Sequence, residues 1–218
     1  MRTFTRYVVG VCLTGALFAA LPSALAASQP AVQAASDPVR VTSLNNGRFR
    51  LRQGRVGTVI DLNSSVNGCT GQLYDGGTGE KYNVGVDVRV LDEVNRAGSW
   101  YLLMQVDTGP NCNVQGMCGA GTNTDLIWLK LSPGLKVVAK QAEMVENCQT
   151  GAALTDLNGR GASDDDDVVK LGLRGGVLNL TSVSQDYGNN TQARVTLRYD
   201  RRTPERGLLR TKTQTPLN

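Results

Sequence analysis

One stretch of the chain carries enough closely spaced side-chain oxygens to hold a metal ion. It spans residues 156–167 and reads DLNGRGASDDDD. Matched to a twelve-position calcium-binding loop, it has acidic or amide side chains at positions one, three, nine and twelve. Gly161 falls at position six, where such a loop turns sharply around the ion. The spacing therefore predicts a calcium site with the ligands Asp156, Asn158, Asp164 and Asp167.

The same segment resembles the D-x-N-G-x-G loops of EF-hand-like and integrin-type calcium repeats. This resemblance implies a calcium-dependent surface or matrix protein. Two positions depart from the pattern: Arg160 stands at position five, which normally supplies a ligand, and Asp167 replaces a longer, bidentate Glu at position twelve. The alternative is an exposed acidic turn whose side chains bond their own backbone. Four adjacent carboxylates repel one another, so such a turn gains from cations even without a defined site.

The chain contains no histidine among its 218 residues. This excludes a Ser-His-Asp triad, a Cys-His pair and any metal site that needs a His ligand. Acid–base catalysis would fall to carboxylates, Lys or Tyr. The 19 Asp and Glu residues offer carboxylate pairs by number, but none stands in a recognisable catalytic frame. Glu143 and Glu146 are three residues apart and would share a face only on a helix. Because no catalytic arrangement is recognisable, we favour a protein that is not an enzyme.

The N-terminus has the order of an export signal. Two arginines precede a mostly apolar run over 7–21, and an A-x-A cleavage site follows at residues 24–26. We therefore expect a signal peptide over 1–26, a flexible leader over 27–38, and a periplasmic or extracellular location. The signal holds two of the 23 basic residues and no acidic one, so the mature net charge is 21 − 19 = +2. We expect no membrane span in the mature chain.

Four cysteines remain after the signal peptide, and an even number in an oxidising compartment predicts two disulfides. Three connectivities are possible, and the sequence alone does not choose among them. We favour Cys118–Cys148 together with Cys69–Cys112, because a bridge from Cys112 to Cys118 would close only a local loop. A bridge closing roughly thirty residues should contribute about 3–4 kcal/mol.

Hydrophobicity along the mature chain repeats mainly every second residue, as in strands with one wet face. Residues 47–52 alternate arginine with apolar side chains, and 84–91 and 195–199 show the same period. The runs 100–106 and 126–131 are more continuously apolar, which predicts central strands. Further strands are expected at 39–43, 56–63, 136–146, 168–173 and 177–184, of which 136–146 also fits a helical stripe.

Turn residues separate most of these runs, and no β-α-β rhythm is visible. The pattern predicts an all-β protein: a single antiparallel sandwich or open barrel, stapled by disulfides, over residues 39–199. The basic segment 200–218 is expected to be a disordered tail.

A short region also carries a resemblance to other sequences. Residues 118–121 read CGAG, the apolar strand 126–129 follows, and a second cysteine stands about thirty residues on. This order is similar to that of a loosely defined group of uncharacterised secreted bacterial proteins, over about residues 112–148. The resemblance implies a secreted β-domain and supports the Cys118–Cys148 pair, but it implies no activity.

Four arginines make a basic strand edge: Arg48, Arg50, Arg52 and Arg55. A mature charge of +2 is far below that of a polyanion binder, so we expect no nucleic-acid partner. Charged edge strands protect sheets from pairing with other chains, and edge protection is the interpretation that we favour for these arginines.

The leading hypothesis is a non-enzymatic β-domain of the bacterial envelope that binds another macromolecule, a protein or an envelope polymer. An inhibitor or immunity-type protein is one concrete form. The alternatives are a calcium-dependent surface or matrix protein and a carboxylate-based hydrolase of envelope polysaccharide.

Overall fold

A computed structural model describes residues 37–44, 46–75, 77–83, 85–109, 112, 121–156 and 171–217. Within these ranges the regular structure consists of strands and two single-turn 3-10 helices, η1 (Asn63–Ser65) and η2 (Pro204–Arg206). The prediction of an all-β protein is thus confirmed. The predicted signal peptide and most of the leader lie outside the described residues.

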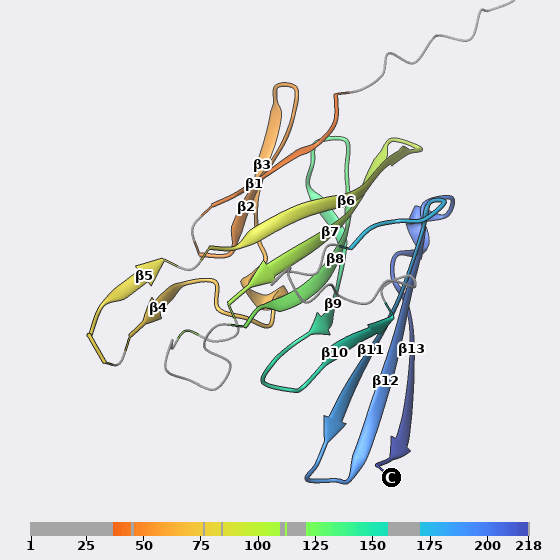
Figure 1. Ribbon diagram of the computed structural model, residues 1–218. Helices are drawn as coiled ribbons and strands as arrows, with labels where there is room; N and C mark the ends of the chain where they lie inside the picture. Colours follow the sequence, from red (N-terminus) through yellow and green to blue (C-terminus); the bar gives the residue numbers. More distant parts are fainter. Residues whose placement is uncertain are drawn as a thin grey trace, which may run out of the picture. The chain divides into compact units, whose positions relative to one another are not determined.

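The strands form four antiparallel sheets, and in each sheet neighbouring strands follow one another along the chain (Figure 1). The first sheet contains β1 (Arg40–Ser43), β2 (Arg48–Gln53) and β3 (Val56–Asp61). A small hairpin follows, made of β4 (Gln72–Tyr74) and β5 (Lys81–Asn83). The central sheet contains β6 (Asp87–Arg96), β7 (Ser99–Thr108), β8 (Asn123–Leu131) and β9 (Val137–Glu146). The last sheet contains β10 (Ala153–Asp156), β11 (Val177–Asp186), β12 (Thr191–Asp200) and β13 (Leu209–Pro216).

Strands β7 and β8 are buried on both faces, as their continuous apolar runs predicted. On β7, Leu102 and Met104 pack into one hydrophobic cluster, while Tyr101 and Leu103 pack into a second. Strand β8 divides its side chains between the same two clusters. The central sheet is therefore covered on both faces.

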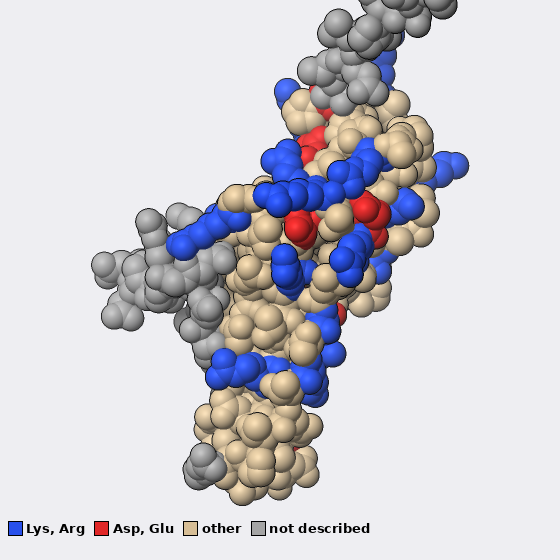
Figure 2. Space-filling view, turned by 90° about the vertical axis from the view of Figure 1, so that its right-hand side faces the viewer, with Lys and Arg blue, Asp and Glu red and all other residues tan. Residues whose placement is uncertain are grey.

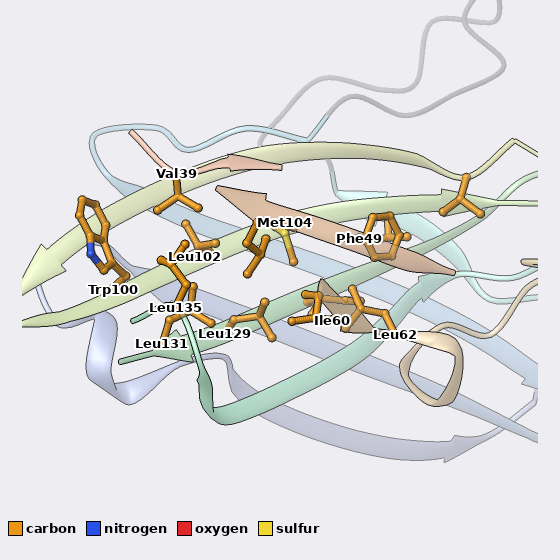
Figure 3. Close-up of a cluster of buried hydrophobic side chains, with 14 residues drawn as sticks. Val39, Phe49, Ile60, Leu62, Trp100, Leu102, Met104, Leu129, Leu131 and Leu135 are labelled. Atoms are coloured by element: carbon orange, nitrogen blue, oxygen red, sulfur yellow. The ribbon is translucent and has the colours of Figure 1, made fainter. Parts of the chain in front are cut away.

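The first cluster joins the central sheet to the sheet β1-β2-β3. Phe49, Leu51 and Ile60 supply its apolar side chains from β2 and β3. Figure 3 shows Phe49 and Ile60 among the other buried side chains of this cluster, including Leu102 and Met104 of β7. Phe49 and Leu51 have no exposed surface, so this contact fixes which face of β2 points inward.

The second cluster joins the opposite face of the central sheet to β11 and β12. Leu180 and Leu197 contribute from these strands, together with Tyr199. The Tyr199 hydroxyl donates a 2.8 Å hydrogen bond to the buried Asp92 carboxylate, and burial is the main cause that raises the pKa of Tyr199. A polar pair thus stands in an otherwise apolar interface, with each group satisfied.

Residues 200–218 differ from the prediction of a disordered tail, and this is a correction. Leu209–Pro216 forms β13, which pairs with β12 over eight residues. All eight side chains are exposed, so the segment reads as polar and unstructured in sequence. Its order comes from backbone hydrogen bonds to the edge of β12, which hydrophobicity does not report.

Other elements follow the expected pattern with shifted bounds. Segment 136–146 forms strand β9 and not a helix. The turn at 188–190 joins β11 to β12 as a hairpin. Of the predicted strand 168–173, only residues 171–173 are described, and they are not in a strand.

A disulfide joins Cys69 to Cys112 across 43 residues, one of the two bridges that the sequence analysis favoured. Cys148 is also disulfide-bonded. The other predicted bridge, Cys118–Cys148, involves Cys118, which lies outside the described residues. In the described ranges, no helical segment has the length and apolarity that a membrane crossing needs.

Candidate functional site

The alternating sequence of β2 places its arginines on the outer face of the first sheet. Arg48, Arg50 and Arg52 are exposed, while the intervening Phe49 and Leu51 are buried against the central sheet. Because side chains alternate along a strand, the buried pair forces all three guanidinium groups to the same side. Core packing therefore fixes the direction of the charged row.

Strands β1 and β3 extend this row into a surface. Arg40 of β1 lies directly opposite Arg52, and Thr42 lies opposite Arg50. Cross-strand partners share a face, so these side chains join the same outer surface. Arg55 lies in the two-residue turn between β2 and β3 and is exposed. We call the five exposed arginines Arg40, Arg48, Arg50, Arg52 and Arg55 the arginine face.

The arginine face concentrates positive charge: its one acidic cross-strand neighbour is Asp61, opposite Arg48, and no ion pair forms between them. Among the described residues, the four ion pairs involve Arg96, Arg198, Arg201 and Arg210, none of which belongs to this face. Arg40 and Arg52 are like charges at directly opposed positions, an arrangement that destabilises a sheet. The repulsion between Arg40 and Arg52 lowers the stability of this sheet, which indicates that the arginines serve a role other than stability.

Some of the basic residues elsewhere form ion pairs that connect elements. Figure 2 shows the side of the molecule that lies at the right of Figure 1, where Lys and Arg side chains cover more of the surface than Asp and Glu. Around β12 and β13, however, Arg210 pairs with Glu143 at 3.0 Å and Arg201 with Asp92 at 3.4 Å. These contacts hold elements together, whereas the arginine face leaves its guanidinium groups toward solvent.

Two hollows flank the row that Arg50 and Arg52 form. One, of about 460 Å³, is lined by Arg50, Arg52, Arg55, Gly57, Thr58 and Val59. The other, of about 530 Å³, is lined by Arg40, Thr42, Arg50, Arg52 and residues near the start of β1, among them Asp37. The arginine face is thus hollowed on both sides of Arg50 and Arg52. An anionic group in either hollow can contact more than one guanidinium group.

The interpretation of these arginines as edge protection is wrong. Strand β2 lies between β1 and β3, so both of its backbone edges are already paired. Charges on a central strand cannot shield an edge from another chain. The sequence showed the alternation, but only the pairing of both neighbours showed that β2 is central.

A second constellation lies where β6, β7 and β8 meet at one end of the central sheet. Asp87 of β6 is the direct cross-strand partner of Asp107 of β7. Both line a pocket of about 390 Å³ together with Thr108 and Thr122. Opposed residues of an antiparallel pair have Cα atoms about 4.5–5.5 Å apart, so the two carboxylates face a common space.

Asp107 belongs to a buried polar network. Its carboxylate accepts hydrogen bonds from Gln105 Nε2 at 2.8 Å and from the Thr124 hydroxyl at 2.7 Å. The neighbouring Asp125, with no exposed surface, accepts two bonds from Asn67, through its backbone N–H and its amide group. These donors satisfy carboxylates that would otherwise be too costly to bury.

Burial raises the pKa of Asp107, Asp125 and Glu146 above the usual carboxyl range. The hydrogen bonds that each accepts offset this effect in part. Asp107 and Glu146 both contact the Thr124 hydroxyl, which carries one proton and can donate to only one of them. The network therefore favours retention of a proton on one carboxyl group.

Of the calcium site predicted at 156–167, only Asp156 lies within the described residues. Asp156 ends β10, where its backbone pairs with Thr181. Asn158, Asp164 and Asp167 lie outside the described residues. Within the described ranges no group of three or more acidic or Cys side chains is arranged to hold a metal ion. Glu143 and Glu146 stand apart, since Glu143 pairs with Arg210 and Glu146 joins the Thr124 network.

The buried aspartates at this end of the sheet, Asp107 and Asp125, were not predicted as site residues from the sequence. Their signal was present: Asp107 ends one continuously apolar run and Asp125 begins the other. Antiparallel pairing sets Asp107 opposite Thr124 and Asp125 opposite Val106, so the two aspartates lie at the same end of the sheet, on opposite faces.

Comparisons of the chain with known protein families, with curated proteins and with solved structures found no match. The function is therefore inferred from the geometry of these surfaces.

Proposed function

We propose that this chain is an exported, non-enzymatic β-domain that binds a negatively charged macromolecule through the arginine face. A protein, as for an inhibitor or immunity-type domain, and an anionic envelope polymer are the two forms of partner. The observation that carries the proposal is the set of five exposed arginines, free of ion pairs among the described residues, on a sheet whose other face is locked into the core.

The chemistry of arginine supports this proposal. A guanidinium presents five N–H donors in a planar fork and pairs with carboxylate or phosphate in bidentate fashion. A charged surface of this kind mainly speeds association with an oppositely charged partner and adds specificity. The affinity for that partner falls as salt screens the charges. Export fits the Cys69–Cys112 disulfide, since such bonds persist in oxidising compartments.

The test compares the wild-type chain with the double variant Arg50→Gln/Arg52→Gln in capture from periplasmic extract. We expect the wild type to retain an acidic protein or polymer at low salt, and the double variant to lose at least tenfold of that binding, which is about 1.4 kcal/mol. Arg194→Gln is the matched control, because it removes one exposed arginine from β12, in another sheet. Equal capture by all three proteins would remove the arginine face as the binding surface.

A second candidate function is a carboxylate-based hydrolase of envelope polysaccharide. The observation in its favour is the cross-strand pair Asp87–Asp107 on one pocket, with the pKa of Asp107 raised mainly by burial. In such a reaction Asp107 would donate the proton as general acid, and the more exposed Asp87 would act as base or nucleophile.

This candidate is tested with Asp107→Asn, which keeps the size of the side chain and removes its acid. Release of sugar fragments from purified envelope polysaccharide should fall by a factor of about 100 or more in the variant. Glu143→Gln serves as the control, because that carboxyl pairs with Arg210 away from the pocket. Absence of any hydrolysis by the wild type would end this candidate.

A further inference from the structure

We infer that the hollow over Gly57 is a subsite for one phosphate group of a phosphate-bearing envelope polymer. The inference rests on the proposed function and names the chemistry of its partner. Its starting observation is a glycine at the second position of strand β3, directly opposite Arg52.

Nothing in the fold requires glycine at this position. The backbone of Gly57 is not in the left-handed region, and an added Cβ would meet only the Leu51 carbonyl oxygen, at 3.4 Å. Glycine inside a strand lowers stability and often marks a place where a ligand approaches the backbone closely. By contrast, Gly54 in the adjacent turn has a φ of 53°, which does explain a glycine. Gly57 is therefore best explained by the space that it leaves.

That space is surrounded by positive charge. Arg50, Arg52 and Arg55 line the hollow, and Gly57 and Val59 contribute uncharged surface. None of its described lining residues is acidic. The hollow on the other side of the row includes Asp37, whose carboxylate would repel an anion. An anionic group is thus directed to the hollow over Gly57.

The number of donors favours phosphate over carboxylate. Three guanidinium groups carry up to fifteen N–H donors, and a phosphate diester of a polymer backbone offers more acceptor oxygens than a carboxylate, at the same charge of −1. The source is a polymer without bases, because sequence-tolerant binding of single-stranded nucleic acid uses aromatic stacking platforms. The outward side chains of β1, β2 and β3 include no aromatic residue in their described positions.

The first experiment follows the arginine Nε–H signals of the full chain by nuclear magnetic resonance during titration with inorganic phosphate. We expect the signals of Arg50, Arg52 and Arg55 to shift together and to saturate, and acetate at the same ionic strength to give smaller shifts. Equal shifts with acetate would overturn the assignment to phosphate. Shifts spread evenly over arginines of other sheets, such as Arg194, would overturn the subsite.

The second experiment fills the hollow with Gly57→Val and measures binding to poly(glycerol phosphate). We expect at least a tenfold loss of affinity, together with a rise in melting temperature of about 2 °C, because valine favours a strand. A loss of binding in a more stable protein cannot come from unfolding. Gly71→Val, which adds the same side chain outside both hollows where an added Cβ meets nothing within 4 Å, should bind like the wild type.

The outcomes separate this subsite from the wider proposal. If wild type and Gly57→Val bind the polymer equally, the subsite is wrong while the arginine face stands. If the wild type binds neither the polymer nor any extract component, the proposed function itself fails. Tighter binding to a single-stranded oligonucleotide than to poly(glycerol phosphate), at equal phosphate, would overturn the choice of partner.

Discussion

At the scale of single residues, the protein separates its charges by environment. The arginines of β2 are solvated because their neighbours Phe49 and Leu51 occupy the core. The carboxylates at the end of the central sheet are buried instead, and side-chain amides and hydroxyls satisfy them. The first arrangement attracts an external anion, whereas the second makes stability depend on protons.

The buried carboxyls predict a stability that falls as the pH rises through mildly acidic values. Burial raises the folded-state pKa of Asp107, Asp125 and Glu146 above that of the unfolded chain. Between the two pKa values the folded state binds more protons, so its stability decreases with rising pH until these groups are ionised. The absence of histidine leaves no other side chain with an ordinary pKa in the range from about 5 to 8.

Urea unfolding at about pH 5 and pH 7.5 measures this effect, and the midpoint should be higher at the lower pH. Asp186, whose pKa is lowered mainly by hydrogen bonds from Asn189, adds stability that is lost only as the pH falls below the ordinary carboxyl range. It therefore does not act in the tested interval. A midpoint that rises from pH 5 to pH 7.5 would contradict the role given to burial.

At the scale of elements, position in a sheet changes the meaning of a sequence. Strand β2 is rich in arginine because its outer face is solvated and both its edges are paired. Strand β13 has no buried side chain at all, and its place is set by backbone pairing with β12 and by the ion pair of Arg210 with Glu143 of β9. The two strands show that polar composition alone distinguishes neither a central strand nor a tail.

Deletion of residues 209–218 tests the account of β13. We expect the free energy of unfolding to change by less than about 1–2 kcal/mol, because net gains from backbone hydrogen bonds are close to the entropy lost on ordering the segment. Amide hydrogen exchange along β12 should accelerate strongly, since one edge of that strand becomes exposed. Leu208 is retained because it is buried. Global unfolding of the truncated chain would mean that β13 stabilises the core directly.

At the scale of the whole described domain, two hydrophobic clusters on opposite faces of the central sheet connect three sheets. The hairpin β4–β5 lies between the two cysteines of the Cys69–Cys112 bridge in the chain. The loop that the disulfide closes also contains β6 and β7, and β7 contributes buried side chains to both clusters.

Replacement of Cys69 and Cys112 by alanine should lower the free energy of unfolding by about 4 kcal/mol on the loop-entropy account. Denaturant unfolding of the double variant measures the loss. A single Cys69→Ala variant would leave a free thiol, so the double variant is the cleaner comparison. A loss below about 1 kcal/mol would show that the unfolded loop is already constrained.

The sequence by itself determined the all-β class, the alternation of β2 and the two central strands, because these follow from local periodicity of two residues. It also pointed to the Cys69–Cys112 bridge among several possible pairs. It could not determine that β2 is central, that β13 is ordered, or that Asp87 faces Asp107. Those features depend on which strands lie side by side, and pairing is decided by contacts between residues far apart in the chain. Only the tertiary structure therefore shows that the arginines form one surface and that Gly57 lines a hollow in it.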